Sequence, residues 1–243
     1  MNWVIDPPGR NILPVIGTEA VFPVGNVFCV GRNYADHAVE MGGDPDREPP
    51  FFFIKPSFSV LSPGHEMIYP DHSDDVHHEV EMVVALGTGG RNVRVQDAMQ
   101  LVFGHAVGVD MTRRDRQAEA KEQRRPWEAG KSFVHAAPCS MITPIELTGA
   151  IETAGVSLSI NGEVRQSGDV NQMIWKIPEI ISRLSELFVL EAGDLIFTGT
   201  PAGVGPVKTG DELLANIDGL SELAFRISER RGVLAETGNL RGI

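Results

Sequence analysis

The sequence predicts an α+β fold that consists mostly of β-strands. Two dipeptides typical of tight hairpins, Asn161-Gly162 and Asp218-Gly219, each separate two stretches with apolar residues at alternating positions. Short apolar runs bounded by Gly and Pro, such as VFCVG at 27–31 and FFFIKP at 51–56, are typical of further strands. Hairpins outnumber strand–helix–strand units, so we expect largely antiparallel sheets with a few covering helices.

The elements are expected in the following order. The Pro- and Gly-rich residues 1–25 predict an irregular lead-in, residues 26–230 one folded domain, and the polar residues 231–243 a C-terminal tail. Within the domain, strands are expected at 27–31, 51–56, 79–87, 104–110, 156–160, 163–168, 194–201 and in two parts of 211–228. Helical segments are expected at 34–41, 97–103, 112–123 and 174–188, the last with Pro178 in its first turn.

The composition excludes several classes of partner. The chain has 243 residues, of which 42% are hydrophobic, and its 33 acidic against 21 basic residues give a net charge of −12. Such an acidic chain repels phosphate backbones and anionic lipid, so we expect neither nucleic acid nor membrane as a partner. Cys29 and Cys139 lie far apart in apolar contexts, which indicates buried free thiols. The N-terminus lacks the features of a signal peptide, and we expect a cytoplasmic protein.

Two acidic residues on one expected strand suggest a metal site. Glu79 and Glu81 are two positions apart and therefore point to the same face. Two carboxylates on a buried face repel each other unless a cation lies between them, and oxygen ligands favour Mg²⁺ or Mn²⁺ over zinc. Asp110 ends the expected strand 104–110 and completes a set of three carboxylates. The alternative is an edge strand whose acidic face is simply solvated.

His37 and Glu40 form a second set of candidate residues. Their spacing of three places both on one face if the segment is helical, and a carboxylate beside an imidazole supports a general base. The alternative is an ordinary exposed pair. Lys131 in GKSF and the glycine-rich TGTPAGVG at 198–205 are further candidates, although a lone lysine is normally solvated and the loop matches no nucleotide-binding fingerprint.

Taken together and in this order, seven segments resemble the fumarylacetoacetate hydrolase family. They are VGRNYADH, FFFIKPS, HHEVEM, GVDMTRRDRQAE, PWEAGKSF, NGEVRQSGD and GDLIFTGTPAGVGPVKTGDE, and they cover the chain from Val27 to about Ile227. The chain resembles the short acylpyruvase branch of that family, and within it most of all the fumarylpyruvate hydrolases. The resemblance implies a mixed β-sandwich or roll with a mobile lid, a homodimer, and a bound Mg²⁺ or Mn²⁺.

The resemblance also implies roles for individual residues. Glu79, Glu81 and Asp110 match the metal ligands, and His37 with Glu40 matches a water-activating pair on the lid. The catalytic set is completed by Lys131 in the pocket. The substrate-binding residues that it implies are Arg32, Tyr34, Gln117 and Thr200. We add the hypothesis that Arg124 or Arg125 pairs with the remote carboxylate of the substrate.

The implied activity is hydrolysis of a carbon–carbon bond in an acylpyruvate, with fumarylpyruvate as the expected substrate. In that reaction a water activated by His37 attacks the distal ketone, and pyruvate enolate leaves. The alternative is oxaloacetate decarboxylation, or decarboxylation or isomerisation of a dienoate, which needs the same metal-enolate site but no attacking water. Two further alternatives are a non-catalytic ligand-binding scaffold and a β-rich interaction protein. The acyl group and the choice between Mg²⁺ and Mn²⁺ stay open.

Overall fold

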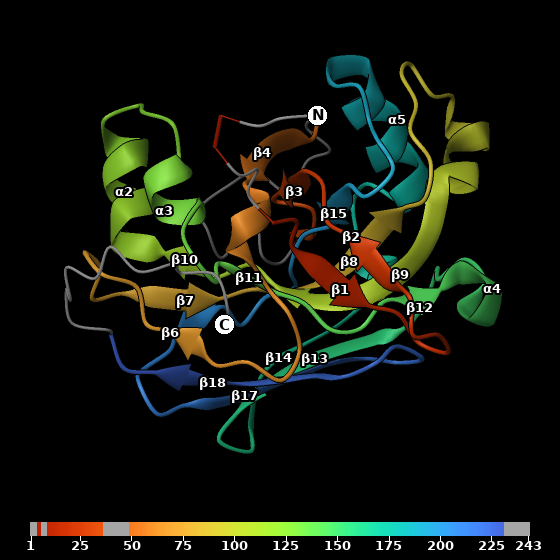
Figure 1. The fold of residues 1–243 in the computed structure, drawn as a ribbon. Coiled ribbons are helices and arrows are strands. Elements are labelled where there is room, and N and C mark those ends of the chain that lie inside the picture. Colours follow the sequence, from red (N-terminus) through yellow and green to blue (C-terminus); the bar gives the residue numbers. More distant parts are fainter. Residues whose placement is uncertain (1–3, 6–8, 36–48, 231–243) are drawn as a thin grey trace.

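A six-stranded mixed sheet forms the centre of the molecule (Figure 1). The computed structural model describes residues 4–5, 9–35 and 49–230. The strands follow the order β12-β9-β8-β15-β3-β4, and all neighbours except β15 and β3 run antiparallel. Their bounds are β12 Thr143–Pro144, β9 Val102–Val109, β8 Val80–Leu86, β15 Leu195–Phe197, β3 Val27–Gly31 and β4 Phe51–Lys55.

Strand β8 is buried on both faces, as its unbroken apolar run predicts. Every residue from Val80 to Leu86 is buried. Val80, Met82 and Val84 belong to the larger apolar core, whereas Val83 and Ala85 belong to a smaller core on the opposite face. Because side chains alternate along a strand, one strand supplies both cores.

A five-stranded sheet, in the order β14-β13-β17-β18-β6, packs against the larger core. Asn161 and Gly162 turn the chain between β13 and β14, and Asp218-Gly219 lies between β17 and β18, so both predicted hairpins are confirmed. Asn161 and Gly162 both have positive φ, which is the conformation that the tight turn requires. The strands are β14 Glu163–Asp169, β13 Gly155–Ile160, β17 Glu212–Ile217, β18 Leu223–Ser228 and β6 Met67–Ile68.

Three small sheets complete the strands. They are the pair β1 Ile12–Pro14 and β2 Val21–Pro23, the pair β5 Val60–Leu61 and β11 Ala137–Pro138, and the set β10 Thr112–Arg113, β7 Val76–His78 and β16 Gly205–Pro206. The first pair differs from the irregular lead-in that the sequence predicts. Leu13 and Phe22 of this hairpin are buried in the smaller core, which stabilises strands that Pro and Gly alone disfavour.

Helices lie at the ends of the molecule, and those at 114–122 and 177–187 are shorter than the segments predicted at 112–123 and 174–188. Helices α2 and α3 lie at one end and α5 at the other (Figure 1). Helix α5 begins at Ile177 rather than at 174, because Lys176 has extended backbone dihedrals and its N–H donates to Glu179 Oε2 at 3.0 Å, which caps the helix at this point. The α-helices are α2 Arg114–Glu122, α3 Glu128–Lys131, α4 Ile145–Thr148 and α5 Ile177–Leu187, and the 3₁₀ helices are η1 Ser57–Ser59, η2 Val95–Leu101 and η3 Val170–Gln172.

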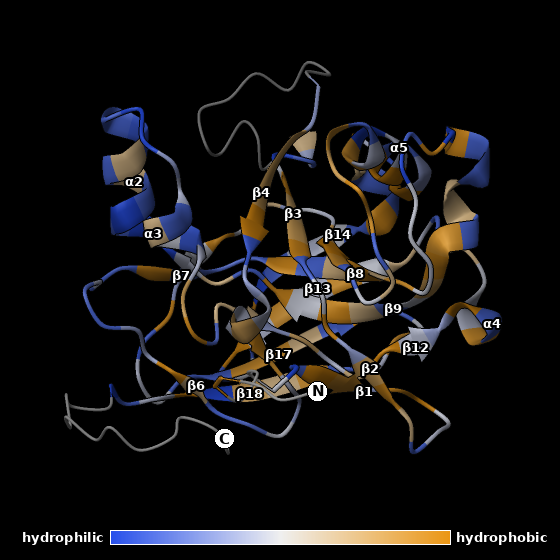
Figure 2. Ribbon diagram, turned by 45° about the horizontal axis from the view of Figure 1, so that its top comes forward, coloured by the Kyte–Doolittle hydropathy of each residue, from blue (hydrophilic) through white to orange (hydrophobic). Residues whose placement is uncertain are grey.

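The hydropathy of the elements follows this layering (Figure 2). The central strands are mostly apolar, whereas α2 is mostly polar. Helix α5 buries Ile177, Ile180 and Leu184 on one face, as its spacing predicts. Among the described residues, no helix is long and apolar enough to cross a membrane. Because α2 is mostly polar, contacts other than an apolar stripe must hold it in place.

Candidate metal centre and active site

Four strand ends of the central sheet meet at one edge. Because β8 runs antiparallel to both β9 and β15, the start of β8 lies beside the ends of these two neighbours. Strand β3 is parallel to β15 and ends at the same edge. This topology brings together Glu79 and Glu81 from the start of β8, Asp110 after β9, and Thr200 beyond β15.

The three predicted metal ligands form one buried cluster. Ligand oxygens of Glu79, Glu81 and Asp110 all lie within 4.8 Å of one another. The side chains are buried, and the backbone N–H of Asp110 donates to the carbonyl of Glu79 at 2.8 Å. Two separate segments of the chain thus supply three carboxylates to one point in space.

Cationic side chains hold two of these carboxylates. Lys131 Nζ donates to Glu79 Oε2 at 2.8 Å, to Asp110 Oδ2 at 2.7 Å and to Thr112 Oγ1 at 2.7 Å. Lys55 Nζ lies 2.8 Å from Asp110 Oδ1, and Arg114 pairs with Glu79 Oε1. Burial alone would lower the pKa of Lys131, but the charges of Asp110 and Glu79 outweigh it and raise that pKa. Lys131 is therefore an ammonium ion.

Glu81 differs from its two neighbours because it accepts a hydrogen bond from a backbone amide. Its Oε2 accepts from the N–H of Gly199 at 2.7 Å. Burial, followed by repulsion from Asp110 and Glu79, raises the pKa of Glu81 well above its usual range. A divalent cation among the three oxygens removes this repulsion, and hard cations such as Mg²⁺ and Mn²⁺ prefer an all-oxygen set. The residues present therefore fit a divalent cation.

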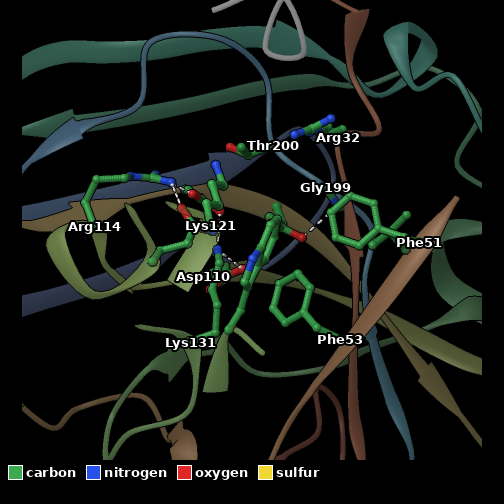
Figure 3. Close-up of a pocket in the computed structure, with 15 residues that line it drawn as sticks. Arg32, Phe51, Phe53, Asp110, Arg114, Lys121, Lys131, Gly199 and Thr200 are labelled. Carbon is green, nitrogen blue, oxygen red and sulfur yellow. Dashed lines mark hydrogen bonds and ion pairs between the residues drawn. The ribbon is translucent and has the colours of Figure 1, made fainter. Parts of the chain in front are cut away.

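A cavity of about 410 Å³, counted out to its open mouth, extends from this cluster to the surface (Figure 3). Its floor is buried, whereas Arg32 and Phe51 at its rim are exposed. Helix α2 forms one wall with Arg114, Gln117 and Lys121, whose spacing of three and four places them on one helical face. The other lining residues are Val30, Gly31, Phe53, Glu79, Glu81, Asp110, Trp127, Lys131, Gly199 and Thr200.

The hydrogen bonds of α2 explain how a polar helix is fixed above the site. Arg114 donates to Gln117 Oε1 at 2.6 Å and also pairs with Glu79. Ser73 donates to Asp115 at 2.8 Å from the opposite side. The close packing of α3 on α2 depends on Gly130, because a Cβ at that position would lie 2.9 Å from the backbone nitrogen of Gln117. Polar contacts, and not an apolar stripe, place this wall.

The predicted site residues fall into three groups. Lys131, Gln117, Thr200 and Arg32 line the cavity together with the three carboxylates. Tyr34 is buried and Arg124 and Arg125 are exposed just beyond α2, and the described lining of the cavity includes none of these three. His37 and Glu40, and with them the expected lid, lie outside the described residues.

Sequence reasoning missed several functional side chains. Arg114 and Lys55 contact the carboxylate cluster directly, and Lys121 lines the cavity, but none of the three was a candidate, although Lys55 and Arg114 stand in segments that carry the family resemblance. Trp127 and Phe51 form an edge-to-face pair with ring centroids 5.1 Å apart at the cavity wall. The sequence did hold one signal for Arg114 and Lys121. Both lie in the helical segment predicted after Asp110, and the spacing of 114, 117 and 121 places them on the same helical face as Gln117.

Comparisons with known proteins agree with this architecture. Residues 26–228 match the family described as fumarylacetoacetate (FAA) hydrolase C-terminal. The crystal structure of fumarylpyruvate hydrolase from Pseudomonas aeruginosa, in complex with Mn²⁺ and pyruvate, is 46% identical with a TM-score of 0.92. That comparison covers 94% of this chain and 100% of the other.

Two curated relatives carry different names. The mitochondrial oxaloacetate tautomerase of Mus musculus is 44% identical over 202 residues, which are 83% of this chain and 91% of that protein. The mitochondrial oxaloacetate decarboxylase of Dictyostelium discoideum is 41% identical over 207 residues, which are 84% of this chain and 94% of that protein. With its β-rich fold, its buried acidic triad and a family match over most of its length, the chain belongs to the fumarylacetoacetate hydrolase family.

Proposed function

We propose that the protein is a metal-dependent enzyme that acts on a doubly charged 2-oxo acid and stabilises its enolate. The observation that carries this proposal is the charge balance of the cavity. The three carboxylates are matched by three cations, Lys55, Lys131 and Arg114. A divalent cation then adds two positive charges to a cavity that Lys121 and Arg32 also line, and this positive excess favours a dianionic substrate.

The divalent cation, when bound, supplies the Lewis acid that polarises the oxygens of the oxo acid. Glu79, Glu81 and Asp110 are the residues that would hold it. Lys131 uses its three N–H donors on protein oxygens, so its first task is to keep Glu79 and Asp110 close together. A direct contact between Lys131 and the substrate requires one of these hydrogen bonds to be exchanged.

Gln117 offers a donor to the substrate. Arg114 can only donate, so the oxygen of the Gln117 amide is the acceptor and its NH₂ group remains for the cavity. Gln117 is buried and lines the cavity. Its NH₂ group is suited to an oxygen of the 2-oxo acid, where negative charge increases as the enolate forms.

The far end of the cavity suits a second carboxylate. Lys121 lies two helical turns beyond Arg114, about 10 Å along the axis of α2. Burial and the positive charges of Arg114 and Arg32 lower the pKa of Lys121. An anion between Lys121 and Arg32 relieves this repulsion, and the rings of Phe51 and Trp127 offer a flat apolar wall to the intervening carbon chain.

Two substrates are consistent with this site. The names of the curated relatives favour oxaloacetate, through tautomerisation or decarboxylation, which need the enolate but no attacking water. The offset of Lys121 from Arg114 along α2 and the solved relative with bound pyruvate favour cleavage of fumarylpyruvate. The seven-carbon chain of fumarylpyruvate spans about 8 Å, roughly two Cα–Cα spacings, which matches the offset of Lys121 better than the four-carbon oxaloacetate does. Cleavage additionally needs the water-activating role predicted for His37 and Glu40.

The experiment compares three substrates in wild type and a Lys121→Met variant. We expect excess chelator to abolish turnover of oxaloacetate, fumarylpyruvate and acetylpyruvate, and Mg²⁺ or Mn²⁺ to restore it. Loss of a hydrogen bond to a charged group costs about 1.5–3 kcal/mol, so K121M is expected to lower kcat/KM for fumarylpyruvate by roughly 10–100-fold. Acetylpyruvate, which lacks the remote carboxylate, should be unaffected.

The matched control is the double variant Arg124→Ala/Arg125→Ala. If these exposed arginines hold the remote carboxylate instead, this variant and not K121M loses activity on fumarylpyruvate. The larger wild-type kcat/KM decides between oxaloacetate and fumarylpyruvate as the substrate. Full turnover of either in excess chelator would refute the proposal as a whole.

A further inference from the structure

The side chain of Gln166 connects the strand that carries the metal ligands to the loop beyond β15. Gln166 belongs to β14 and is fully buried. Its Oε1 lies 3.0 Å from the backbone N–H of Val80 and 2.9 Å from His78 Nδ1. Its Nε2 lies 2.8 Å from Thr200 Oγ1 and 2.9 Å from the carbonyl of Pro201.

These four contacts allow the amide of Gln166 only one orientation. A backbone N–H can only donate, so the atom facing Val80 must be the amide oxygen. A backbone carbonyl can only accept, so the atom facing Pro201 must be the NH₂ group. Both of the amide hydrogens are then used, one on Pro201 and one on Thr200.

We propose that Gln166 is a positioning residue that makes the Thr200 hydroxyl a hydrogen-bond donor toward the cavity. A hydroxyl group has one hydrogen, and the oxygen of Thr200 already accepts from Gln166. The hydrogen of Thr200 is therefore available to another acceptor, and Thr200 lines the cavity beside the metal cluster. An acceptor in place of Gln166 would reverse this hydroxyl and withdraw the donor.

This polarity identifies the chemical class of the ligand. Thr200 and Gln117 both present donors to the cavity, whereas the N–H of Gly199 is already used by Glu81. A ligand that meets donors must bring acceptors, such as carboxylate or oxo oxygens. The inference thus rests on the proposed function, and it adds the residue that sets the direction of the substrate-binding hydrogen bond.

The same chain of hydrogen bonds fixes the tautomer of His78. Because Oε1 of Gln166 is an acceptor, Nδ1 of His78 carries the hydrogen. Nε2 then has no hydrogen in the neutral ring. His78 is buried, so the ring is shielded from exchange with bulk water. The tautomer can be measured in the unaltered protein, independently of any substrate.

The test is a double-mutant cycle read by calorimetric titration of pyruvate into Mn²⁺-loaded protein. Thr200→Val should weaken pyruvate binding by roughly 10–100-fold, as expected for a lost hydrogen bond to a charged group, and Thr200→Ser should restore it. Gln166→Met should weaken it to a similar extent. If Gln166 acts through Thr200, the two losses of pyruvate affinity are not additive. The double variant should then bind pyruvate about as tightly as whichever single variant binds it more weakly.

Two outcomes would overturn the inference. Additive losses in the double variant would show that Gln166 does not act through Thr200. An equal loss of Mn²⁺ affinity in Q166M would show that Gln166 only supports the metal site. Titration of Mn²⁺ into each variant therefore accompanies the pyruvate measurement.

A second measurement covers the possibility that Q166M does not fold. We expect nitrogen NMR of histidine-labelled, metal-free wild type at about pH 8, above the ordinary pKa of histidine, to show His78 with its hydrogen on Nδ1. A hydrogen on Nε2 would refute the assigned polarity. Failure of wild type to bind pyruvate would instead count against the proposed function, and the tautomer would still decide the inference.

Discussion

Replacing Glu81 by glutamine is expected to stabilise the metal-free protein and at the same time to remove its affinity for a divalent cation. Glu81 is 2% exposed, and its oxygen accepts from the N–H of Gly199. The side-chain amide of glutamine can accept the same hydrogen bond through its own oxygen. The substitution therefore removes the cost of burying an ionisable carboxyl group, whose pKa is raised well above its usual range, with little change in shape.

The magnitude follows from the separation of the carboxylates. Even at 4.8 Å, the limit within which the ligand oxygens lie, two like charges repel by about 3.5 kcal/mol at an effective dielectric constant of about 20. Glu81 has two such neighbours, and the cations of the cluster offset part of their repulsion. The gain expected for E81Q in chelator is therefore only part of this repulsion, about 1–3 kcal/mol.

The matched control is Asp110→Asn, which we expect to destabilise the metal-free protein instead of stabilising it. Asp110 pairs with Lys55 and Lys131, so its loss leaves Lys55 without its carboxylate and leaves Lys131 paired with Glu79 alone. Breaking a buried pair from one side costs about 3–5 kcal/mol. Changes to residues that support the ligands of a metal typically lower metal affinity by roughly 10–100-fold. Glu81 and Asp110 are proposed as ligands themselves, so E81Q and D110N should each lose more metal affinity than that.

The assay is urea unfolding followed by circular dichroism, in excess chelator and in saturating Mg²⁺. Wild type should gain stability from Mg²⁺, whereas E81Q should gain none and should exceed wild type in chelator. An E81Q protein that is less stable than wild type in chelator, by as much as D110N, would refute the argument that Glu81 is the uncompensated charge of the cluster.

Two further predictions concern groups outside the active site. Burial lowers the pKa of His105 to about 4, so between pH 6.5 and 4 the unfolded chain binds a proton that the folded protein does not, and stability is lost as the pH falls through this window. The loss is about 2 kcal/mol at pH 5; urea unfolding should show it in wild type and not in His105→Gln, and an equal loss in both would contradict the assignment. Burial also raises the pKa of Cys139 to about 12 and that of Cys29 well above its usual range. A thiol reagent at about pH 8, below the ordinary thiol pKa, should therefore modify neither residue in the native protein and both after unfolding, and rapid native labelling would show that the thiols are accessible.

The local elements were predictable because their causes are local. The two hairpins follow from the conformations that Asn-Gly and Asp-Gly favour, and the double-sided burial of β8 follows from its continuous apolar run. The lengths of α5 and η2 were less well predicted. Helix α5 begins after Lys176, whose backbone N–H donates to Glu179 three residues later. The residues before it, Ile174 and Trp175, donate to Asn33 of a distant segment, and no local pattern of the helix shows those contacts.

The sequence by itself determined which side chains were candidates for the metal site: alternation placed Glu79 and Glu81 on one face, and the end of an apolar strand marked Asp110. Only the tertiary structure decided that these carboxylates meet, that Lys55 and Arg114 neutralise them, and that Gln166 reaches Thr200. The physical reason is the range of the interactions. Turn chemistry and side-chain periodicity act over a few residues, whereas the pairing of strands far apart in the chain depends on the burial of the whole core.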